Sequence, residues 1–464
     1  MRPVLSPRQM RVIDAEAVSL GTSLEVLVAR AGAAVARAAR RMLGGLYGRT
    51  VVVVIGKGNN GADGRVTARL LADEGVRVHV LDAEAMPARI PTCDLIIDSA
   101  YGTGFRGHWA PPSTRGIPVL AVDIPSGVDG LTGLAVPGAW PATRTVTFVA
   151  LKPGQLLGRG PALCGEVELV DIGIRIPRSS IDVHEVEATD VSEWIPPRAW
   201  DAHKWHHSLY ALAGSAGMMG AASLCTSAAM RAGAGIVHVA SPGISSDRGT
   251  PVEVVRRSLP MLGWSIDVLA ELDRFKAMVV GPGLGRDEGT VHEVRRVIAQ
   301  SNLPMVIDGD GLFAVAWGGE GARDIVRSRP AGTILTPHDG EYATLLGTPP
   351  TPDRISSVRK LAVDTNCVVL LKGSTTVVAE PSGQALIVAN GDERLATAGS
   401  GDVLTGIIGA LLTRGVPPFH AAAAGAWIHA QAGSSYPHAE GLLAGDLVEL
   451  VPTAFASMRG RSGS

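Results

Sequence analysis

The sequence is poor in cysteine and in aromatic residues. Its 464 residues include four cysteines and only 4% Phe, Trp and Tyr. No two cysteines form a CxxC pair, so neither a disulfide framework nor a structural zinc site is indicated, and a reducing cytoplasm is the expected compartment. The low aromatic content disfavours binding sites built from aromatic cages, whereas 57 glycines favour tight turns and close approaches of a ligand to the backbone.

The chain also lacks an excess of charge of either sign and long hydrophobic runs. Lys and Arg number 42 against 44 for Asp and Glu, and no basic stretch is sustained, which argues against nucleic acid as a partner. The first residues carry no apolar signal core, and Gly, Pro or charged residues interrupt the apolar runs well before the roughly 18 residues that a membrane span needs. A soluble protein without a membrane partner is expected.

The length and the hydrophobic content of 46% predict two globular domains. Residues 175–197 are polar, acidic and bounded by prolines, as interdomain connections often are. We therefore expect one domain over residues 1–190 and a second over 191–464.

Both halves alternate strand-like and helix-like segments. An amphipathic helix is predicted over 24–43, followed by buried strands at 51–55, 76–81, 94–98, 118–124 and 145–151. The second half repeats this alternation, with predicted helices over 220–233, 289–300, 353–364 and 403–413. The alternation indicates an α/β fold with parallel sheets in each half.

Polar side chains follow three of the predicted strands in the first half. The turn GKGNNGADG at 56–64 matches GxGxxG, which alone indicates an ordinary dinucleotide fold. Its polar side chains exceed what a phosphate cradle needs, and two later strand ends carry further ones. Asn60, Asp98, Asp123 and Ser126 are expected to converge at one edge of a parallel sheet, where oxygen ligands suit a hard cation. The alternative for each Asp alone is a turn-capping carboxylate.

Together with TVTFVALKPG at 145–154, these motifs resemble the NAD(P)H-hydrate epimerase domain over nearly all of residues 8–174. The resemblance implies a Rossmann-like three-layer α/β/α fold. It further implies that Asp123 acts as base or acid at C6 of the hydrated nicotinamide, and that potassium is held by Asn60, Asp98 and Ser126. The implied substrate contacts are Asn59, Asn60, Gly61, Ala62, Asp63, Gly102, Thr103, Gly104, Phe105, Arg106, Gly107, His108 and Asp123. Ala62 departs from the family, which usually has glycine there.

The strongest motif of the chain is ATAGSGDVLTGIIGALLTRG at 396–415. Gly399, Ser400 and Gly401 offer free backbone amides before the predicted helix, which together make an anion site. Asp402 could be an ordinary cap of that helix. Beside a phosphate-binding turn, the same carboxylate can instead take the proton of a substrate hydroxyl during phosphoryl transfer.

Other strand ends supply groups that suit such a site. Lys372 is followed by the turn GSTT at 373–376, which offers a cation and hydroxyls for phosphates or is a plain strand-end turn. The segments TPHDGE at 336–341 and GPGLG at 281–285 follow other strands. Since no GxxxxGK[ST] sequence is present, the phosphate chemistry is not that of a P-loop enzyme.

In this order, the motifs resemble the ribokinase-like ADP-dependent NAD(P)H-hydrate dehydratases over about residues 200–455. The implied reaction phosphorylates the C6 hydroxyl of the S hydrate with ADP and then expels phosphate, which leaves NAD(P)H and AMP. Magnesium accompanies the ADP, and Asp402 is the implied base. The implied hydrate contacts are Ala221, Gly285, His338 and Asp402. The implied nucleotide contacts are Lys372, Gly373, Ser374, Thr375, Thr376 and Gly401.

One segment departs from that family. Its glycine-rich HKGxxG loop reads HKWHHS at 203–208, and the bulky side chains are expected either to narrow nucleotide access or to add aromatic stacking. His203, His206 and His207 could also be read as a metal cluster, although no accompanying carboxylate or cysteine pattern supports this. A surface loop is the plain alternative.

The resulting hypothesis is a cytoplasmic bifunctional repair enzyme that epimerises R and S hydrates of NAD(P)H and dehydrates the S form. Three alternatives remain: a ribokinase-like small-molecule hydroxyl kinase, a non-catalytic nucleotide-sensing or protein-binding module, and a dehydrogenase. The sequence leaves open a homo-oligomeric state, the preference between the NADH and NADPH hydrates, ADP against ATP as donor, and the effect of the HKWHHS loop on the second site.

Overall fold

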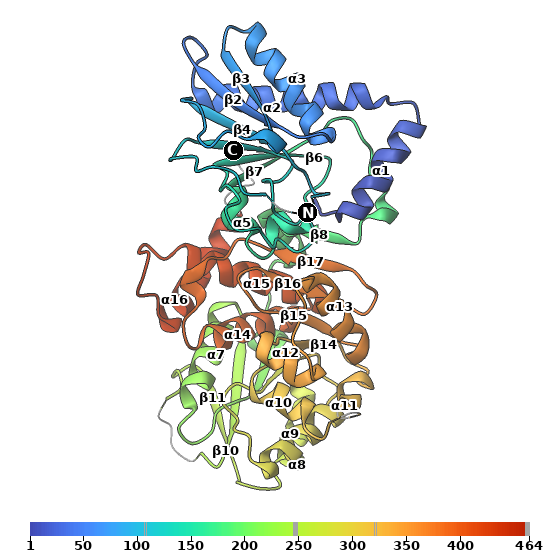
Figure 1. The fold of residues 1–464 in the computed structure, drawn as a ribbon. Helices are drawn as coiled ribbons and strands as arrows, with labels where there is room; N and C mark the ends of the chain where they lie inside the picture. The colour runs from blue at the N-terminus through green and yellow to red at the C-terminus, as the bar shows by residue number, and fades with distance from the viewer. Residues whose placement is uncertain (106, 108, 245–248, 320, 322, 460–464) are drawn as a thin grey trace. The chain divides into compact units, whose positions relative to one another are not determined.

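The computed structural model describes residues 1–105, 107, 109–244, 249–319, 321 and 323–459. The chain divides into two compact units, Arg2–Val183 and His184–Ser464 with Met1. Figure 1 shows the first in blue to green and the second in green to red. The predicted boundary at residue 190 lies within α6 (Ala188–Trp194), and the assignment of one activity to each predicted domain stays a prediction.

The first unit is built on a six-stranded parallel sheet in the order β3-β2-β4-β5-β6-β7. The strands are β2 (Thr50–Ile55), β3 (Arg77–Asp82), β4 (Leu95–Ser99), β5 (Val119–Val122), β6 (Arg144–Phe148) and β7 (Glu166–Val170). The apolar runs of β2, β4 and β5 are buried on both faces, which confirms the predicted parallel α/β class. The predicted burial of the strand at 76–81 is wrong, because β3 lies at the edge of the sheet and most of its side chains are exposed.

Helices cover the sheet of the first unit. The elements outside the sheet are β1 (Arg2–Pro3), α1 (Pro7–Ser19), α2 (Leu24–Leu43), α3 (Asn59–Asp73), η1 (Ala83–Ala85), α4 (Pro153–Leu156), α5 (Gly160–Cys164) and η2 (Arg178–Ser180). The helix predicted over 24–43 is confirmed as α2. The hydroxyl of Ser23 accepts from the Val26 amide at its start, and Gly44, with φ of 64°, ends it.

The second unit contains a larger sheet in the order β17-β16-β15-β14-β13-β12-β9-β10-β11, in which β16 alone runs antiparallel to its neighbours. Its strands are β9 (Ser208–Leu212), β10 (Ile236–Pro242), β11 (Val255–Leu259), β12 (Ala277–Val280), β13 (Met305–Ile307), β14 (Thr333–Leu335), β15 (Val368–Leu371), β16 (Thr376–Ala379) and β17 (Ala385–Val388). The short β8 (Val183–Glu185) lies where the two units meet in the sequence.

The helices of the second unit lie on both faces of its sheet (Figure 1). Besides α6 they are η3 (Lys204–His207), α7 (Met219–Arg231), α8 (Ser265–Glu271), η4 (Leu272–Arg274), α9 (Glu288–Gln300), α10 (Asp310–Ala316), α11 (Asp324–Arg327), α12 (Asp339–Leu346), α13 (Arg354–Thr365), η5 (Glu393–Leu395), α14 (Ser400–Thr413), α15 (Pro418–Ser434) and α16 (Ala444–Arg459). In the part of the chain that the structure describes, no helix is both long and apolar enough to cross a bilayer.

Helix α14 is the centre of the second unit. It packs against α7, α15 and β12, and every residue from Val403 to Thr413 is buried. The sequence predicted its start at residue 403, which is three residues too late. Gly399 caps the helix with φ of 88°, a left-handed conformation that glycine adopts without strain, so Ser400, Gly401 and Asp402 form the first turn.

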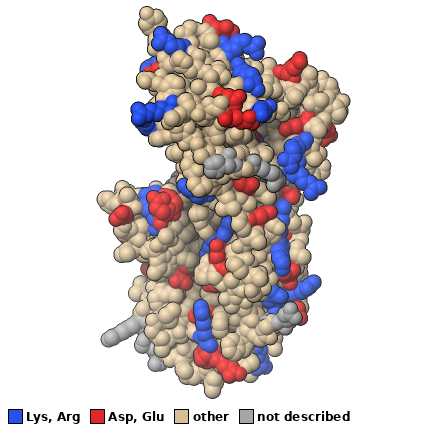
Figure 2. Space-filling model, in the orientation of Figure 1, with Lys and Arg blue, Asp and Glu red and all other residues tan. Residues whose placement is uncertain are grey.

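Charged side chains of both signs are interspersed on the face of the molecule shown in Figure 2. This mixture agrees with the formal net charge of −2.

Two candidate active sites

A cavity of about 820 Å³ opens at the carboxyl ends of the strands of the first unit. Helices α1 and α2 form one wall, and the turn that begins α3 and the loops after β4, β5 and β6 form the rest. The polar residues that line it are Arg11, Asp14, Asn59, Asn60, Asp63, Tyr101, Thr103, Asp123 and Lys152. Parallel α/β sheets commonly bind ligands at this edge.

Asp123 is fixed in the cavity by a set of contacts around one of its oxygens. Its Oδ1 lies 2.6 Å from the Nζ of Lys152 and accepts from the hydroxyl of Thr147 at 3.0 Å. Gln155 donates to its backbone oxygen at 2.6 Å. These contacts hold Asp123 at φ of 67°, a left-handed conformation that costs a non-glycine residue about 1–3 kcal/mol. Such local strain is typical of functional positions.

Lys152 was not predicted to be a functional residue, although it lies within the motif TVTFVALKPG at 145–154. Its side chain is 3% exposed. The signal in the sequence was a lysine placed directly after an apolar strand. A lysine in that position is expected to be buried, and a buried ammonium requires an anionic partner.

Two further carboxyl groups face the cavity. Burial, followed by the nearby charge of Asp123, raises the pKa of Asp63 to about 8. Burial also raises the pKa of Asp14, where Lys152 acts in the opposite direction. Asp63 is therefore mostly protonated at neutral pH.

The residues predicted to hold potassium lie close to one another. Ser126 donates its amide and its hydroxyl to the two oxygens of the buried Asp98, at 2.8 and 2.5 Å. The same hydroxyl accepts from the Tyr101 amide, and the neighbouring Gly102 lies against the side chain of Asn60. The Nδ2 of Asn60 is buried and has no hydrogen-bond partner among the described residues. Burial raises the pKa of Asp98, and hydrogen bonds from Ser126 oppose that rise.

Most of the predicted hydrate contacts line the cavity. They are Asn59, Asn60, Asp63, Gly102, Thr103, Gly104, Phe105 and Asp123. Gly61 instead packs against the backbone of Gly56, and neither Ala62 nor Gly107 is among the lining residues. Arg106 and His108 lie outside the described residues. The wall formed by α1 and α2 was not predicted, because no motif links these helices to the strand ends.

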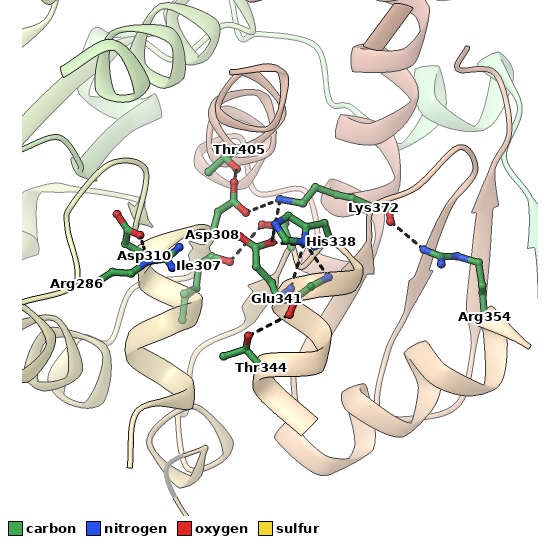
Figure 3. A network of polar contacts seen from close by, with 12 residues as sticks. Arg286, Ile307, Asp308, Asp310, His338, Glu341, Thr344, Arg354, Lys372 and Thr405 are labelled. Atoms are coloured by element: carbon green, nitrogen blue, oxygen red, sulfur yellow. Dashed lines mark hydrogen bonds and ion pairs between the residues drawn. The ribbon is translucent and has the colours of Figure 1, made fainter. Parts of the chain in front are cut away.

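The second candidate site is centred on Lys372, directly after β15 (Figure 3). Its Nζ lies 2.8 Å from an oxygen of Asp308 and 3.5 Å from one of Glu341. The hydroxyl of Thr405, on α14, donates to the other Asp308 oxygen at 2.7 Å. Burial disfavours the charged form of Asp308, but Lys372 outweighs it and holds the pKa of Asp308 below its usual value. The network ties β13, α12, β15 and α14 together.

The GSGD turn lies beside this network. A side chain built at Gly401 would begin 3.6 Å from the Nζ of Lys372 and 3.9 Å from Asp308. Burial, and then the charge of Asp308, raise the pKa of Asp402 to about 7, while Lys372 opposes them. The amide of Ser400, which was predicted to be free, donates instead to the Thr397 carbonyl at 3.3 Å. The structure still places a helix start, a cation and a carboxyl poised near neutrality together, a combination suited to phosphoryl transfer.

The remaining predicted residues of this site border the same edge of the sheet. His338 caps α12, where its Nδ1 accepts from the Gly340 and Glu341 amides at 3.0 and 3.2 Å. The amide of Gly285 donates to Asp310 at 2.9 Å. Ala221 lies on α7 against Gly283. Lys372, Gly373, Ser374, Thr375 and Thr376 lead from β15 into β16.

The HKWHHS loop lies at the opposite edge of the sheet. It forms η3 and precedes β9, whereas the groups above follow the carboxyl ends of their strands. Trp205 packs on the guanidinium of Arg274 at 4.1 Å and on His238 and Phe275. The expected narrowing of nucleotide access is therefore wrong, and the aromatic stacking supports the fold. Within the described residues, no group of three or more His, Cys, Asp or Glu is arranged to hold a metal ion.

Comparison with protein families gives two matches. Residues 209–453 match the family described as NAD(P)H-hydrate dehydratase, and residues 24–90 and 82–154 match the one described as YjeF-related protein N-terminus.

Curated relatives span both units. A bifunctional NAD(P)H-hydrate repair enzyme Nnr of Mycobacterium leprae is 38% identical over 451 residues, which cover 90% of this chain and 91% of that protein. The enzyme of the same name from Escherichia coli is 33% identical over 456 residues, with 89% and 85% covered.

A solved structure resembles the second unit. The ADP/ATP-dependent NAD(P)H-hydrate dehydratase of Bacillus subtilis, co-crystallised with ATP and Mg²⁺, is 27% identical with a TM-score of 0.51. The similarity covers 59% of this chain and 97% of that one. This likeness confirms the predicted ribokinase-like fold.

Proposed function

Since the chain belongs to the family of bifunctional NAD(P)H-hydrate repair enzymes, we propose that its two sites divide the two activities between them. The first unit interconverts the R and S hydrates, and the second dehydrates the S hydrate at the expense of ADP. The observation that carries this proposal is the pair of separate catalytic constellations, Asp123 in a cavity large enough for a nucleotide and Asp402 on a helix start beside Lys372.

In the first site, Asp123 exchanges a proton with the C6 hydroxyl or with water at C6. Asn60, Asp98 and Ser126 would hold the potassium ion. The fit rests on the buried Asp98 carboxyl, which has no cationic side chain in contact among the described residues, and on the Ser126 hydroxyl oxygen 2.5 Å from it. Oxygen donors of this kind suit a hard cation, which would supply a fixed positive charge near the substrate.

In the second site, Asp402 takes the proton of the C6 hydroxyl, whose oxygen then attacks a phosphate of ADP and releases AMP. Expulsion of that phosphate from C6, with loss of a C5 proton, restores NAD(P)H. The turn from Lys372 to Thr376 and the amide of Gly401 hold the nucleotide, and Ala221, Gly285 and His338 contact the hydrate. Magnesium bound with the nucleotide would neutralise charge on its phosphates and would not need a dedicated protein cage.

The alternatives of a small-molecule kinase, a dehydrogenase and a nucleotide sensor are not favoured. Relatives that match both units are named as repair enzymes, and the acidic residues of both candidate sites are in place.

The test is an assay of the purified chain with a mixture of R and S hydrates, ADP and magnesium, followed at the absorbance of reduced nicotinamide. We expect complete conversion of both epimers to NADH. If recovery stops once the S form is consumed, the epimerase is absent, and if none occurs with ADP or ATP, the dehydratase is absent.

A further inference from the structure

Two carboxyl groups in the cavity of the first unit have opposite surroundings. Asp123 contacts a buried ammonium, whereas Asp63 is 7% exposed and contacts no cationic side chain among the described residues. The ammonium group of Lys152 cannot donate to both carboxyl groups. Its three N–H groups are directed to Asp123 at 2.6 Å, to the Thr147 hydroxyl at 2.8 Å and to the Phe148 carbonyl at 3.1 Å. No donor of Lys152 is left for Asp63.

The other charged groups of the cavity do not change this division. From α1, Asp14 adds a third carboxyl and Arg11 lies exposed at the wall. Asp63 itself stands on the first turns of α3, is buried, and lines the same cavity as Asp123. A buried carboxyl beside a like charge keeps its proton, whereas a carboxyl paired with an ammonium loses it. Two carboxyls made unequal in this way can act as acid and base in one reaction.

We propose that Asp63 is the proton donor of epimerisation and Asp123 the proton acceptor. This inference rests on the epimerase activity proposed above, and it makes Asp63 a catalytic residue rather than only a contact of the substrate.

Asp63 gives its proton to the C6 hydroxyl, the C6–O bond breaks and water leaves, while the lone pair of the ring nitrogen N1 forms an N1=C6 double bond. Water then adds to the other face of C6, the N1=C6 electrons return to N1, and the surplus proton passes to Asp123. The pair is then set for the reverse reaction, and proton exchange through water in the cavity resets it.

The experiment supplies R hydrate to the full chain without ADP and measures S hydrate by chromatography between pH 6 and 9, with the spontaneous rate subtracted. Asp63→Asn retains the size and the hydrogen bonds of the side chain but has no acidic proton. We expect its kcat to fall by at least ~100-fold with little change in KM, since general acid catalysis typically contributes that much. The wild-type rate should decline above about pH 8 as Asp63 ionises, and this decline should be missing from the residual rate of the variant.

Asp14→Asn is the matched control, because Asp14 is a second carboxyl of the same cavity. It should change kcat by no more than a few fold. Hydrogen exchange on peptides from β2 and β4 verifies that the first unit of each variant is folded.

A wild-type kcat in Asp63→Asn, a rise in KM alone, or an alkaline decline that persists in the variant would overturn the assignment of Asp63. A wild-type chain that leaves R hydrate unchanged would refute the epimerase activity itself.

Discussion

Replacement of Asp402 by asparagine is expected to make the enzyme more stable while it inactivates the dehydratase. The carboxyl at the start of α14 has a pKa raised from 3.8 to about 7, first by burial and then by the charge of Asp308. Because the folded state binds this proton more tightly than the unfolded state, the folded state loses stability as the pH rises from about 4 to 7. The neutral asparagine avoids that loss.

The magnitude follows from the two pKa values. Each unit between them is worth 1.36 kcal/mol, so the variant should gain at most roughly 4 kcal/mol in free energy of unfolding above pH 7 and roughly 2 kcal/mol at pH 5. In the same variant, the rate of ADP-dependent NADH recovery should fall at least ~100-fold, which is typical of the loss of a general base. In the wild type, that rate should fall below about pH 7 as Asp402 becomes protonated.

The gain is measured by urea unfolding at pH 5 and pH 8, with pulsed hydrogen exchange on peptides from β12 and β13 so that only the second unit is observed. Glu393→Gln, which replaces an acidic residue of the nearby η5, is a control for a simple change in net charge. A stability difference that does not depend on pH, or a variant that recovers NADH at the wild-type rate, would refute the assignment of Asp402 as a buried base.

Two further predictions concern the first unit. Asp123→Asn should abolish enzymatic conversion of R to S hydrate, because the amide cannot accept a proton, while S hydrate is still consumed with ADP; equal repair of both epimers beyond the spontaneous rate would make Asp123 structural. Crystals grown with potassium should show a monovalent ion with oxygen ligands at Asn60, Asp98 and Ser126, and Asp98→Asn should remove it. If potassium can be replaced by a bulky organic cation without any effect on epimerisation, the ion has no role in that reaction.

The strands and the long helices could be predicted from the sequence because their signals are local. Each signal lies within one short segment of the sequence, as in the apolar runs of β2 and β4 and the apolar stripe of α2. The meeting of Asn60 with Asp98 and Ser126 could also be expected, since parallel strands bring their carboxyl ends together.

Contacts between side chains that are distant in the sequence could not be predicted. The pairing of Lys152 with Asp123 depends on the curl of the chain after β6. The division between Asp63 and Asp123 depends on burial, which no single motif encodes. The effect of the HKWHHS loop could not be predicted from its bulk, because its position before β9 puts it at the opposite edge of the sheet from Lys372 and the GSGD turn.

The close packing of α14 in the core fixes the position of Asp402 at its start. Gly406 lies so close to the Cys225 carbonyl of α7 that a methyl group there would overlap it, and Gly425 of α15 meets Ile408 in the same way. These two glycines therefore act as spacers that set the height of Asp402 above the sheet. A mutation there would displace Asp402, the proposed base, although neither glycine is among the proposed substrate contacts. In the evolution of this enzyme, the interior spacers should thus tolerate less change than the exposed Ser374 in the turn after β15.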